Sequence, residues 1–424
     1  MLAFGSVNAQ NITISEINYF SHPSRNSGDW IELHNFDTAS INISKWSFVD
    51  SKPGDTAFIF PQGTMIPAGG YLVVYQNLKN FNSEYPGVKN RIGPFSFKLS
   101  KKSDTLILKD SQQVIVLKMN YSSGKKWPQG AAGLGGRTLE LRNPSSNANL
   151  SSHNAWFDGC MGGSPGQAYT PCNDRVDFSE INYNSDSNYN QSEYVELHNT
   201  TANDINLTGY TLRDNKDSLT HIYYFPQGTT LAAHGYLIVS NDTAAFHAHN
   251  TSVTNYLGPF PFNLSNTGDF IRLYNINGRI MFSVCYRDST TKSWPAAADG
   301  KGYTLELKSD TGIMDDGNNW FAGCFGGSPG YAYASPCKVL GINNIAYSNS
   351  YSIYPNPVLN ILNVEHLSLA PNELRIEDLM GHNVMKYNCT SENTILDLTN
   401  LPRGIYTLRI INNSSVAAFK FIKI

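Results

Sequence analysis

The chain has 424 residues, of which 15% are charged and 12% aromatic, and its formal net charge is −3. An average globular chain carries about 25% charged residues; here Asn, Ser, Thr and Gly separate short apolar runs, which is typical of an exported all-β protein. No apolar run approaches the roughly 18 residues of a membrane-spanning helix, so we expect no transmembrane segment, and the length predicts about three domains.

The first ten residues are expected to stay out of the fold. Residues 7–9 read Val-Asn-Ala before Gln10, like the small-residue end of a signal peptide. No Lys or Arg precedes Arg25, and the apolar stretch is too short for a complete signal. We interpret residues 1–10 as the remnant of a signal peptide behind a misplaced start codon; a disordered N-terminus is the alternative.

The remaining sequence up to residue 337 contains the same motifs twice, in the same order. A period of about 164 residues corresponds to a whole domain with its own core, which predicts a tandem duplication over residues 11–172 and 173–337. The matching motifs are Ser15–Tyr19 and Ser179–Tyr183, Glu32–Asn35 and Glu196–Asn199, Phe60–Thr64 and Phe225–Thr229, Thr138–Leu141 and Thr304–Leu307, and Trp156–Cys160 and Trp320–Cys324.

Within each repeat the apolar residues alternate with polar ones. Ile31 and Leu33 fall on one face of a predicted strand, and Glu32 and His34 fall on the other. Further strands are expected at 71–75, 105–108 and 114–117, and neither repeat has a helical period. Each repeat is therefore predicted to be a β-sandwich. Only Asn173 and Asp174 separate Cys172 from the first strand of the second repeat, so we expect the two sandwiches to be closely coupled.

Four of the six cysteines recur at matching positions. Recurrent pairs in an exported chain predict local disulfides. A metal site is the alternative, but no His or second Cys pair stands at zinc spacing. The predicted bridges are Cys160 with Cys172 and Cys324 with Cys337, which leaves Cys285 and Cys389 as thiols.

The repeats resemble the lamin tail domain, an immunoglobulin-like β-sandwich. The motifs above carry the resemblance, together with the Trp-Pro turns at 127–128 and 294–295 and the Gly-Gly-Ser-Pro-Gly turns at 162–166 and 326–330. It covers nearly all of both repeats. The paired cysteines are additional to the basic pattern and fit its bacterial secreted branch.

Beyond Cys337 the sequence changes character. Residues 338–350 are a predicted linker, and short strands are expected at 361–364, 374–379, 395–398 and 404–408. The last five residues alternate between Lys and apolar side chains, which predicts a terminal strand with an open edge that another sheet could pair with.

Residues 351–424 resemble the type A C-terminal sorting domain of the type IX secretion system of Bacteroidetes. The resemblance implies a third, smaller sandwich, recognition by the type IX secretion machinery, and a secreted or outer-surface location. An ordinary third domain is the alternative. The residues that carry the signal are Tyr354, Pro355, Asn356, Pro357, Gly381, Gly404, Tyr406, Lys420, Lys423 and Ile424.

Three patterns could carry chemistry. The Gly-Gly-Ser-Pro-Gly turns match the nucleophile-elbow pattern, but the residue after the serine is proline, which lacks the N–H that an oxyanion needs. Glu32 and His34 could bind a metal or exchange protons; we favour a solvated strand face with a framework glutamate. Asp315 and Asp316 do not match a calcium loop, and loop solvation is favoured. The sequence therefore predicts no catalytic residue, metal site or cofactor.

The repeats differ in charge. Residues 11–172 hold 15 basic and 11 acidic residues, whereas residues 173–337 hold 9 and 17. A basic cluster in the first repeat could bind nucleic acid, although such clusters are usually solvated faces. Its members are Lys98, Lys101, Lys102, Lys125 and Lys126.

These observations favour a secreted or cell-surface, non-enzymatic binding or structural protein, exported through its C-terminal sorting domain. Its expected extracellular ligand is a protein, a glycan or a nucleic acid. The alternative is a nucleic-acid-binding accessory module of an extracellular nuclease or hydrolase system, because bacterial lamin tail domains often accompany such enzymes.

Overall fold

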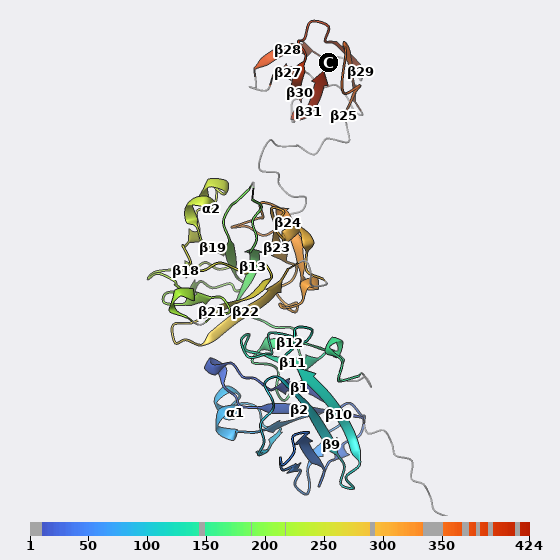
Figure 1. The fold of residues 1–424 in the computed structure, drawn as a ribbon, viewed down its shortest axis with the longest axis vertical. Helices are drawn as coiled ribbons and strands as arrows, with labels where there is room; N and C mark the ends of the chain where they lie inside the picture. Colours follow the sequence, from blue (N-terminus) through green and yellow to red (C-terminus); the bar gives the residue numbers. More distant parts are fainter. Residues whose placement is uncertain are drawn as a thin grey trace, which may run out of the picture. The chain divides into compact units, whose positions relative to one another are not determined.

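The computed structural model describes residues 11–143, 149–187, 189–216, 218–288, 293–333, 351–366, 373–378, 382–388, 393–411 and 416–424. The predicted signal remnant and linker lie outside these residues, as do Cys337, Gly381 and Cys389. The chain forms two compact units, Met1–Ala334 and Ser335–Ile424 (Figure 1). Strands dominate both, which confirms the all-β prediction. None of the described helices has the length and apolarity to cross a bilayer.

The first repeat is a sandwich of two sheets with an aromatic-rich core between them. Its six-stranded sheet runs β12 (Trp156–Met161), β11 (Arg137–Leu141), β1 (Ile12–Asn18), β2 (Trp30–Asn35), β7 (Tyr71–Tyr75) and β8 (Arg91–Ile92). The four-stranded sheet runs β10 (Ile115–Ser122), β9 (Ser103–Lys109), β4 (Ser47–Asp50) and β5 (Phe58–Ile59), and β3 (Ile41–Asn42) pairs with β6 (Met65–Ile66). Ile31, Leu33 and Trp156 are buried in the core, as their alternation predicts.

The second repeat has the same sheet order. Its six-stranded sheet runs β20 (Tyr256–Leu257), β19 (Tyr236–Ser240), β14 (Tyr194–Asn199), β13 (Val176–Asn182), β23 (Tyr303–Leu307) and β24 (Trp320–Phe325). The four-stranded sheet runs β17 (Ile222–Tyr224), β16 (Thr211–Arg213), β21 (Gly268–Tyr274) and β22 (Ile280–Arg287), and β15 (Ile205–Asn206) pairs with β18 (Thr230–Leu231).

Each repeat also contains a short helix, which the sequence did not indicate because neither repeat has a helical period. α1 (Leu78–Glu84) and α2 (Thr243–His249) each place one buried residue, Phe81 or Phe246, against the outer face of the six-stranded sheet. Seven residues with a single buried side chain are too short to show a helical period. The 3-10 turns are η1 (Pro23–Arg25), η2 (His153–Ala155), η3 (Leu219–His221), η4 (Ala296–Ala298) and η5 (Gly317–Asn319).

The second compact unit is a smaller sandwich, as predicted. Its three-stranded sheet runs β25 (Tyr351–Tyr354), β26 (Ile361–His366) and β29 (Asn393–Asp397). The four-stranded sheet runs β28 (Asn383–Asn388), β27 (Glu373–Glu377), β30 (Gly404–Ile411) and β31 (Val416–Lys423). Leu362, Leu396, Leu408 and Phe421 from both sheets are fully buried between them.

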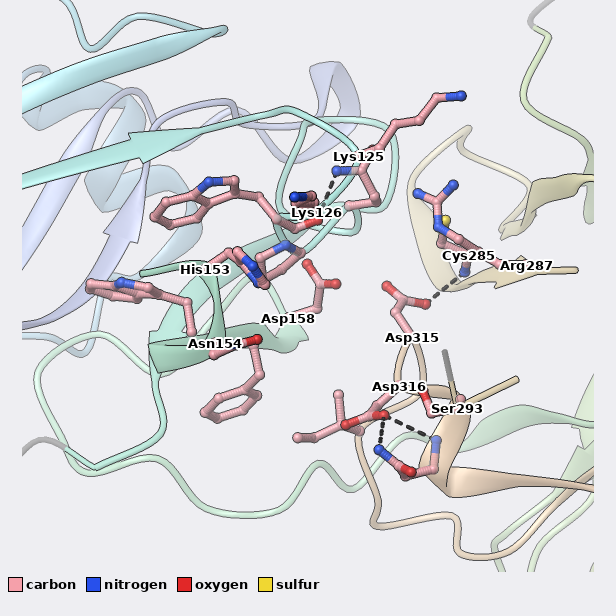
Figure 2. A pocket seen from close by; sticks show the side chains of 18 of the residues that line it. Lys125, Lys126, His153, Asn154, Asp158, Cys285, Arg287, Ser293, Asp315 and Asp316 are labelled. Atoms are coloured by element: carbon pink, nitrogen blue, oxygen red, sulfur yellow. Dashed lines mark hydrogen bonds between the residues drawn. The ribbon is translucent and has the colours of Figure 1, made fainter. Parts of the chain in front are cut away.

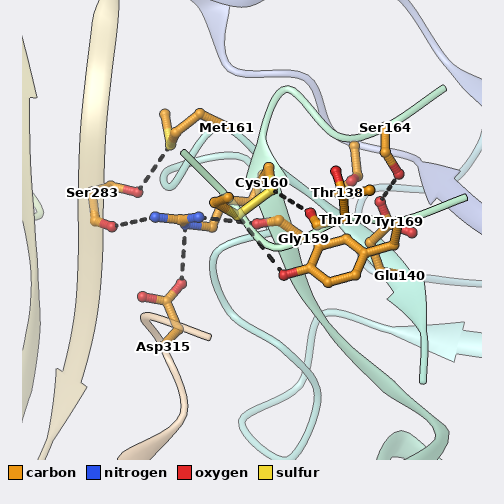
Figure 3. Close-up of a disulfide and its surroundings, with 12 residues drawn as sticks. Thr138, Glu140, Gly159, Cys160, Met161, Ser164, Tyr169, Thr170, Ser283 and Asp315 are labelled. Atoms are coloured by element: carbon orange, nitrogen blue, oxygen red, sulfur yellow. Dashed lines mark hydrogen bonds and ion pairs between the residues drawn. A yellow bond between two sulfur atoms is a disulfide. The ribbon is translucent and has the colours of Figure 1, made fainter. Parts of the chain in front are cut away.

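The cysteines behave as predicted where the structure describes them. Cys160 and Cys172 form a disulfide across 12 residues (Figure 3), a loop that contributes roughly 3 kcal/mol in the chain-entropy model. Cys324 is also disulfide-bonded, and its predicted partner Cys337 lies outside the described residues. Cys285 is a buried free thiol.

Candidate functional site

Three glutamates lie side by side across the six-stranded sheet of the first repeat. β1 pairs with β11 on one side and with β2 on the other, and this register sets Glu16 opposite both Glu140 and Glu32. Since side chains alternate along a strand, all three point away from the core. We call this set the carboxylate row.

The Gly-Gly-Ser-Pro-Gly turn covers the row. The Ser164 hydroxyl donates to Glu140 (2.6 Å), its backbone N–H donates to Glu16 (3.1 Å), and the Gly166 N–H donates to Glu32 (2.5 Å). A Cβ at Gly163, where φ is +82°, would lie 1.9 Å from Glu16 Oε1, so only glycine fits. The serine thus holds a carboxylate in place instead of standing exposed at a nucleophile elbow.

Burial raises the pKa values of the carboxylate row. Glu16 is 0% exposed, and burial raises its pKa well above the ordinary value, with Glu140 and Glu32 adding to the rise. Burial likewise raises the pKa of Glu32 to about 8 and that of Glu140 to about 7. The expectation of a solvated face at Glu32 and His34 is wrong, because the turn that covers this face is encoded more than a hundred residues later. The framework role expected of Glu32 agrees with its contacts.

The second repeat contains the same arrangement. Glu180 stands between Glu306 and Glu196, the Ser328 hydroxyl donates to Glu306 (2.7 Å), and the Gly330 N–H donates to Glu196 (2.6 Å). Burial raises the pKa values of all three carboxyls. Both copies are covered in the same way, so the carboxylate row belongs to the framework that the two repeats share.

The two repeats are joined along one strand edge. β22 is the last strand of its sheet, so one side of its backbone lacks a neighbouring strand. Residues of the first repeat supply partners: the Ile280 N–H donates to the Ser24 hydroxyl (2.9 Å), and Arg25 donates to the Ile280 carbonyl (3.4 Å). The Ser283 hydroxyl donates in turn to the Gly135 carbonyl (2.7 Å).

Arg137 is the central residue of this junction. Its side chain is 1% exposed and donates to the Gly159 carbonyl in its own repeat (3.0 Å) and to the Ser283 carbonyl in the other (2.8 Å). Its Nε lies 3.7 Å from Asp315 Oδ2. The expectation that Asp315 is a solvated loop residue is therefore wrong. Arg279 adds a second link across the junction, with two hydrogen bonds to Glu84 (2.9 and 2.7 Å).

A cleft of about 400 Å³ opens between the repeats beside Arg137. Figure 2 shows Asp158 and Asp315 facing each other across it, with Lys125 and Lys126 on one side and Arg287 on the other. Burial raises the pKa of Asp158 to about 7, and the charge of Asp315 adds to that rise. We call this space the inter-repeat cleft; residues of both repeats line it.

The predicted basic cluster is divided between two loops. The loops lie together, because the Ser123 N–H donates to the Lys102 carbonyl (2.7 Å). Of the five lysines, Lys125 and Lys126 line the inter-repeat cleft, whereas Lys98 lines a separate hollow of the first repeat.

The predicted sorting residues come together in the second compact unit. The Asn356 side chain donates to the Lys420 carbonyl (3.0 Å) and accepts from the Ile422 N–H (2.9 Å). The Val358 N–H donates to the Ile422 carbonyl, and the Val358 carbonyl accepts from the Ile424 N–H. The expectation of an open edge at residues 420–424 is therefore wrong, because residues 356–358 cover it.

The sequence prediction missed the junction residues Arg137, Asp158 and Asp315. Repeat matching marks framework positions that the two copies share, but the junction uses positions where the copies differ: Tyr303 replaces Arg137, and Ala322 replaces Asp158. A charged residue that breaks an otherwise matched motif is the signal that could have identified them.

Stability of the first unit should fall as the pH rises. A carboxyl whose pKa is higher in the folded than in the unfolded state stabilises the folded state. This contribution is fully present below the unfolded pKa of about 4.3, and it is lost as the pH rises through the pKa of the folded state. Thermal melts between about pH 5 and pH 8 should show a falling midpoint. Glu140→Gln, which stays neutral and can still accept from Ser164, should reduce this fall, whereas the exposed control Asp204→Asn should not. A midpoint that rises with pH would contradict this account.

Comparison with known proteins agrees with this architecture. The Lamin Tail Domain family matches residues 6–123 and 170–288, and the Secretion system C-terminal sorting domain matches residues 352–424. Both are non-catalytic domain types. No curated protein matches the chain.

Several solved structures show distant similarity. A DUF4876 family protein from Bacteroides thetaiotaomicron is 10% identical, with a TM-score of 0.23 over 70% of this chain and 93% of that chain. The BSP domain of a biofilm associated protein is 11% identical, with a TM-score of 0.18 over 98% and 81%. PorZ, a surface component of the type-IX secretion system of Porphyromonas gingivalis, is 11% identical, with a TM-score of 0.17 over 94% and 69%.

The sorting domain indicates export by the type IX secretion system to the cell surface or the medium. The repeats, their shared sheet order and the family matches lead to one assignment. The chain belongs to the lamin tail domain family, with two copies of that domain followed by a type IX C-terminal sorting domain.

Proposed function

We propose that this exported protein is a non-enzymatic binding protein whose ligand occupies the inter-repeat cleft. The observation that carries the proposal is the cleft itself: it is lined by both repeats, and buried polar contacts of Arg137 hold its walls together. Ligands bind preferentially in such clefts between domains, where two pre-formed walls limit the entropy lost on binding.

We also propose domain bounds of 11–172, 173–337 and 351–424, because β11 and β12 complete the sheet of the first repeat.

The lining of the cleft favours an anionic ligand. Lys125 and Lys126 are exposed at its first wall beside the Trp127 indole, and Arg287 lies on the second wall. The three aspartates of the cleft, Asp158, Asp315 and Asp316, already accept hydrogen bonds from backbone N–H groups. An acidic glycan fits this lining, because its negative charge can pair with the lysines and its sugar rings can pack on the indole.

The serine and glutamate contacts support a non-enzymatic role. The Ser164 and Ser328 hydroxyls donate to buried glutamates, and each serine precedes a proline. Groups that are covered and hydrogen-bonded in this way are part of the framework. Among the residues that the structure describes, no group of three His, Cys, Asp or Glu side chains could hold a metal ion.

Nucleic-acid binding through the whole basic cluster is the second candidate, favoured by the adjacency of its two loops. Two of its lysines, however, already have internal partners. The Lys101 ammonium lies 4.3 Å from the centroid of the Phe20 ring. Lys101 and Lys98 also oppose the burial that raises the pKa of Asp29 to about 6. We therefore favour a site centred on Lys125 and Lys126.

Two lysine variants separate these candidates. On an array of acidic and neutral glycans, the full chain should bind at least one acidic glycan. The double variant Lys125→Ala with Lys126→Ala should weaken that binding about tenfold, because a loss of this size is typical of one or two charge-assisted contacts. Replacing Lys98, Lys101 and Lys102 by Ala should leave it unchanged. A salt-dependent shift of duplex DNA that both the triple and the double variant weaken would support the second candidate and contradict the first.

For export, we propose that residues 354–357 and 420–424 form one signal, since Asn356 and Val358 bond the terminal strand. Deleting residues 420–424 should trap the protein behind the outer membrane of a host with a type IX system, while the melting of the first unit stays unchanged. Cell fractionation and thermal melting measure both effects, with Lys386→Ala in the same unit as the control. Normal arrival of the truncated protein at the surface would show that the tail is an ordinary third domain.

A further inference from the structure

A second hollow lies within the second repeat, and none of its lining residues belongs to the inter-repeat cleft. It measures about 590 Å³ and adjoins the row of Glu306, Glu180 and Glu196. Asp177, His198 and Tyr236 line one part of it; Phe321, Tyr331 and Tyr333 line another. We call it the tyrosine pocket.

Asp177 is the unusual residue of this pocket. It is 1% exposed, and its Oδ1 lies 3.4 Å from His198 Nδ1. Its Oδ2 has no hydrogen-bond partner among the described residues. A buried carboxylate oxygen is normally hydrogen-bonded or paired with a cation. Burial raises the pKa of Asp177, the hydrogen bond and charge of His198 oppose this rise, and the charges of Asp310 and Asp174 add to it. An ammonium group at Oδ2 would stabilise the ionised carboxylate further.

Aromatic rings form the walls around this carboxylate. The Tyr236 ring stacks on His198 with 4.6 Å between centroids, and Tyr333 meets Phe321 edge-to-face at 4.6 Å. Tyr331 is 59% exposed at the mouth. Ring faces attract cations, and they also pack against alkyl chains.

The first repeat has a cation beside the equivalent aromatic pair. Its frame is the same, with Tyr169 edge-to-face on Phe157 at 4.8 Å between centroids. Above this pair lies the repeat's own cation: the Arg142 guanidinium is 5.4 Å from the centroid of the Phe157 ring. Thr13 stands where the second repeat has Asp177, and Gln167 where it has Tyr331.

The second repeat lacks this internal cation. Lys308 replaces Arg142, and its ammonium donates to the Asn318 carbonyl (2.7 Å). Within the described part of the chain, no Lys or Arg lies over Phe321. The second repeat therefore keeps the aromatic frame and adds a buried carboxylate, while Lys308, which also lines the pocket, donates its ammonium hydrogen bond to a carbonyl.

We propose that the tyrosine pocket binds an alkylammonium group, with the ammonium at Asp177 and the alkyl chain against the tyrosine rings. The excess of acidic over basic residues in this repeat, 17 against 9, favours a cationic ligand. The ammonium belongs either to a lysine side chain of a partner protein or to a small free amine. This site goes beyond the anionic ligand proposed for the inter-repeat cleft.

Binding of two amines to the full chain tests the proposal. The probes are 1,5-diaminopentane and Nα-acetyl-lysine amide, with methyl glucoside as the neutral comparison, measured by calorimetry and by NMR shifts near neutral pH, where the amines stay charged. At least one amine should bind, and Asp177→Asn should weaken that binding at least tenfold. Binding of the lysine amide indicates a protein partner, and binding of the diamine alone indicates a small amine.

Two further variants keep the test independent of folding and of the cleft. Tyr331→Gln introduces the residue of the first repeat at an exposed position, so it should weaken amine binding several-fold with an unchanged melting temperature. Lys125→Ala with Lys126→Ala should leave amine binding unaltered whatever it does to the cleft. The proposal would be overturned if neither amine binds, or if methyl glucoside binds as tightly as the amines. It would also be overturned if the single variants Asp177→Asn and Tyr331→Gln both bind the amines as tightly as the unaltered chain.

Discussion

The edge of β22 that has no neighbouring strand is the constraint on which the arrangement of the two repeats depends. Backbone groups at a sheet edge must find partners, or they invite pairing with another chain. Here the first repeat supplies those partners through Ser24, Arg25 and Arg137. The edge is thus both protected and used to orient one sandwich against the other. The inter-repeat cleft follows from this contact, because its walls are the surfaces that flank the junction.

Arg137 lies at the centre of the junction because a guanidinium can serve several acceptors at once. It reaches carbonyls of both repeats while staying near Asp315, and both side chains of the ion pair are almost fully buried. Breaking a buried pair by removing one partner costs about 3 to 5 kcal/mol, since it leaves an uncompensated charge. The junction is therefore specific to these two surfaces. The same sandwich with Tyr303 in place of Arg137 could not make it.

Much of the fold could be predicted from the sequence because the duplication repeats its own signals. The alternation around Ile31 and Leu33 predicts which face enters the core, and the matched cysteines predict the bridge at Cys160. The burial of Glu16 could not be predicted in this way, because the turn that covers it lies far along the chain. The junction, in turn, is built from residues that the repeats do not share. Repetition therefore identifies the framework, and departures from repetition mark the candidate sites.

The tyrosine pocket follows the same logic, since Asp177 and Tyr331 stand where the first repeat has Thr13 and Gln167. A duplicated framework, with a covered carboxylate row in each copy, lets each copy change a few pocket or junction positions without losing its fold.

The central claim is that the two repeats behave as one unit held by Arg137. Differential scanning calorimetry of the full chain tests it most directly. The account predicts a single transition for both repeats and a separate one for the sorting domain. The variant Arg137→Met keeps about the same side-chain volume but removes the hydrogen-bond donors, so it should divide the first transition into two. Two separate repeat transitions in the unaltered protein, or an undivided transition in the variant, would contradict it.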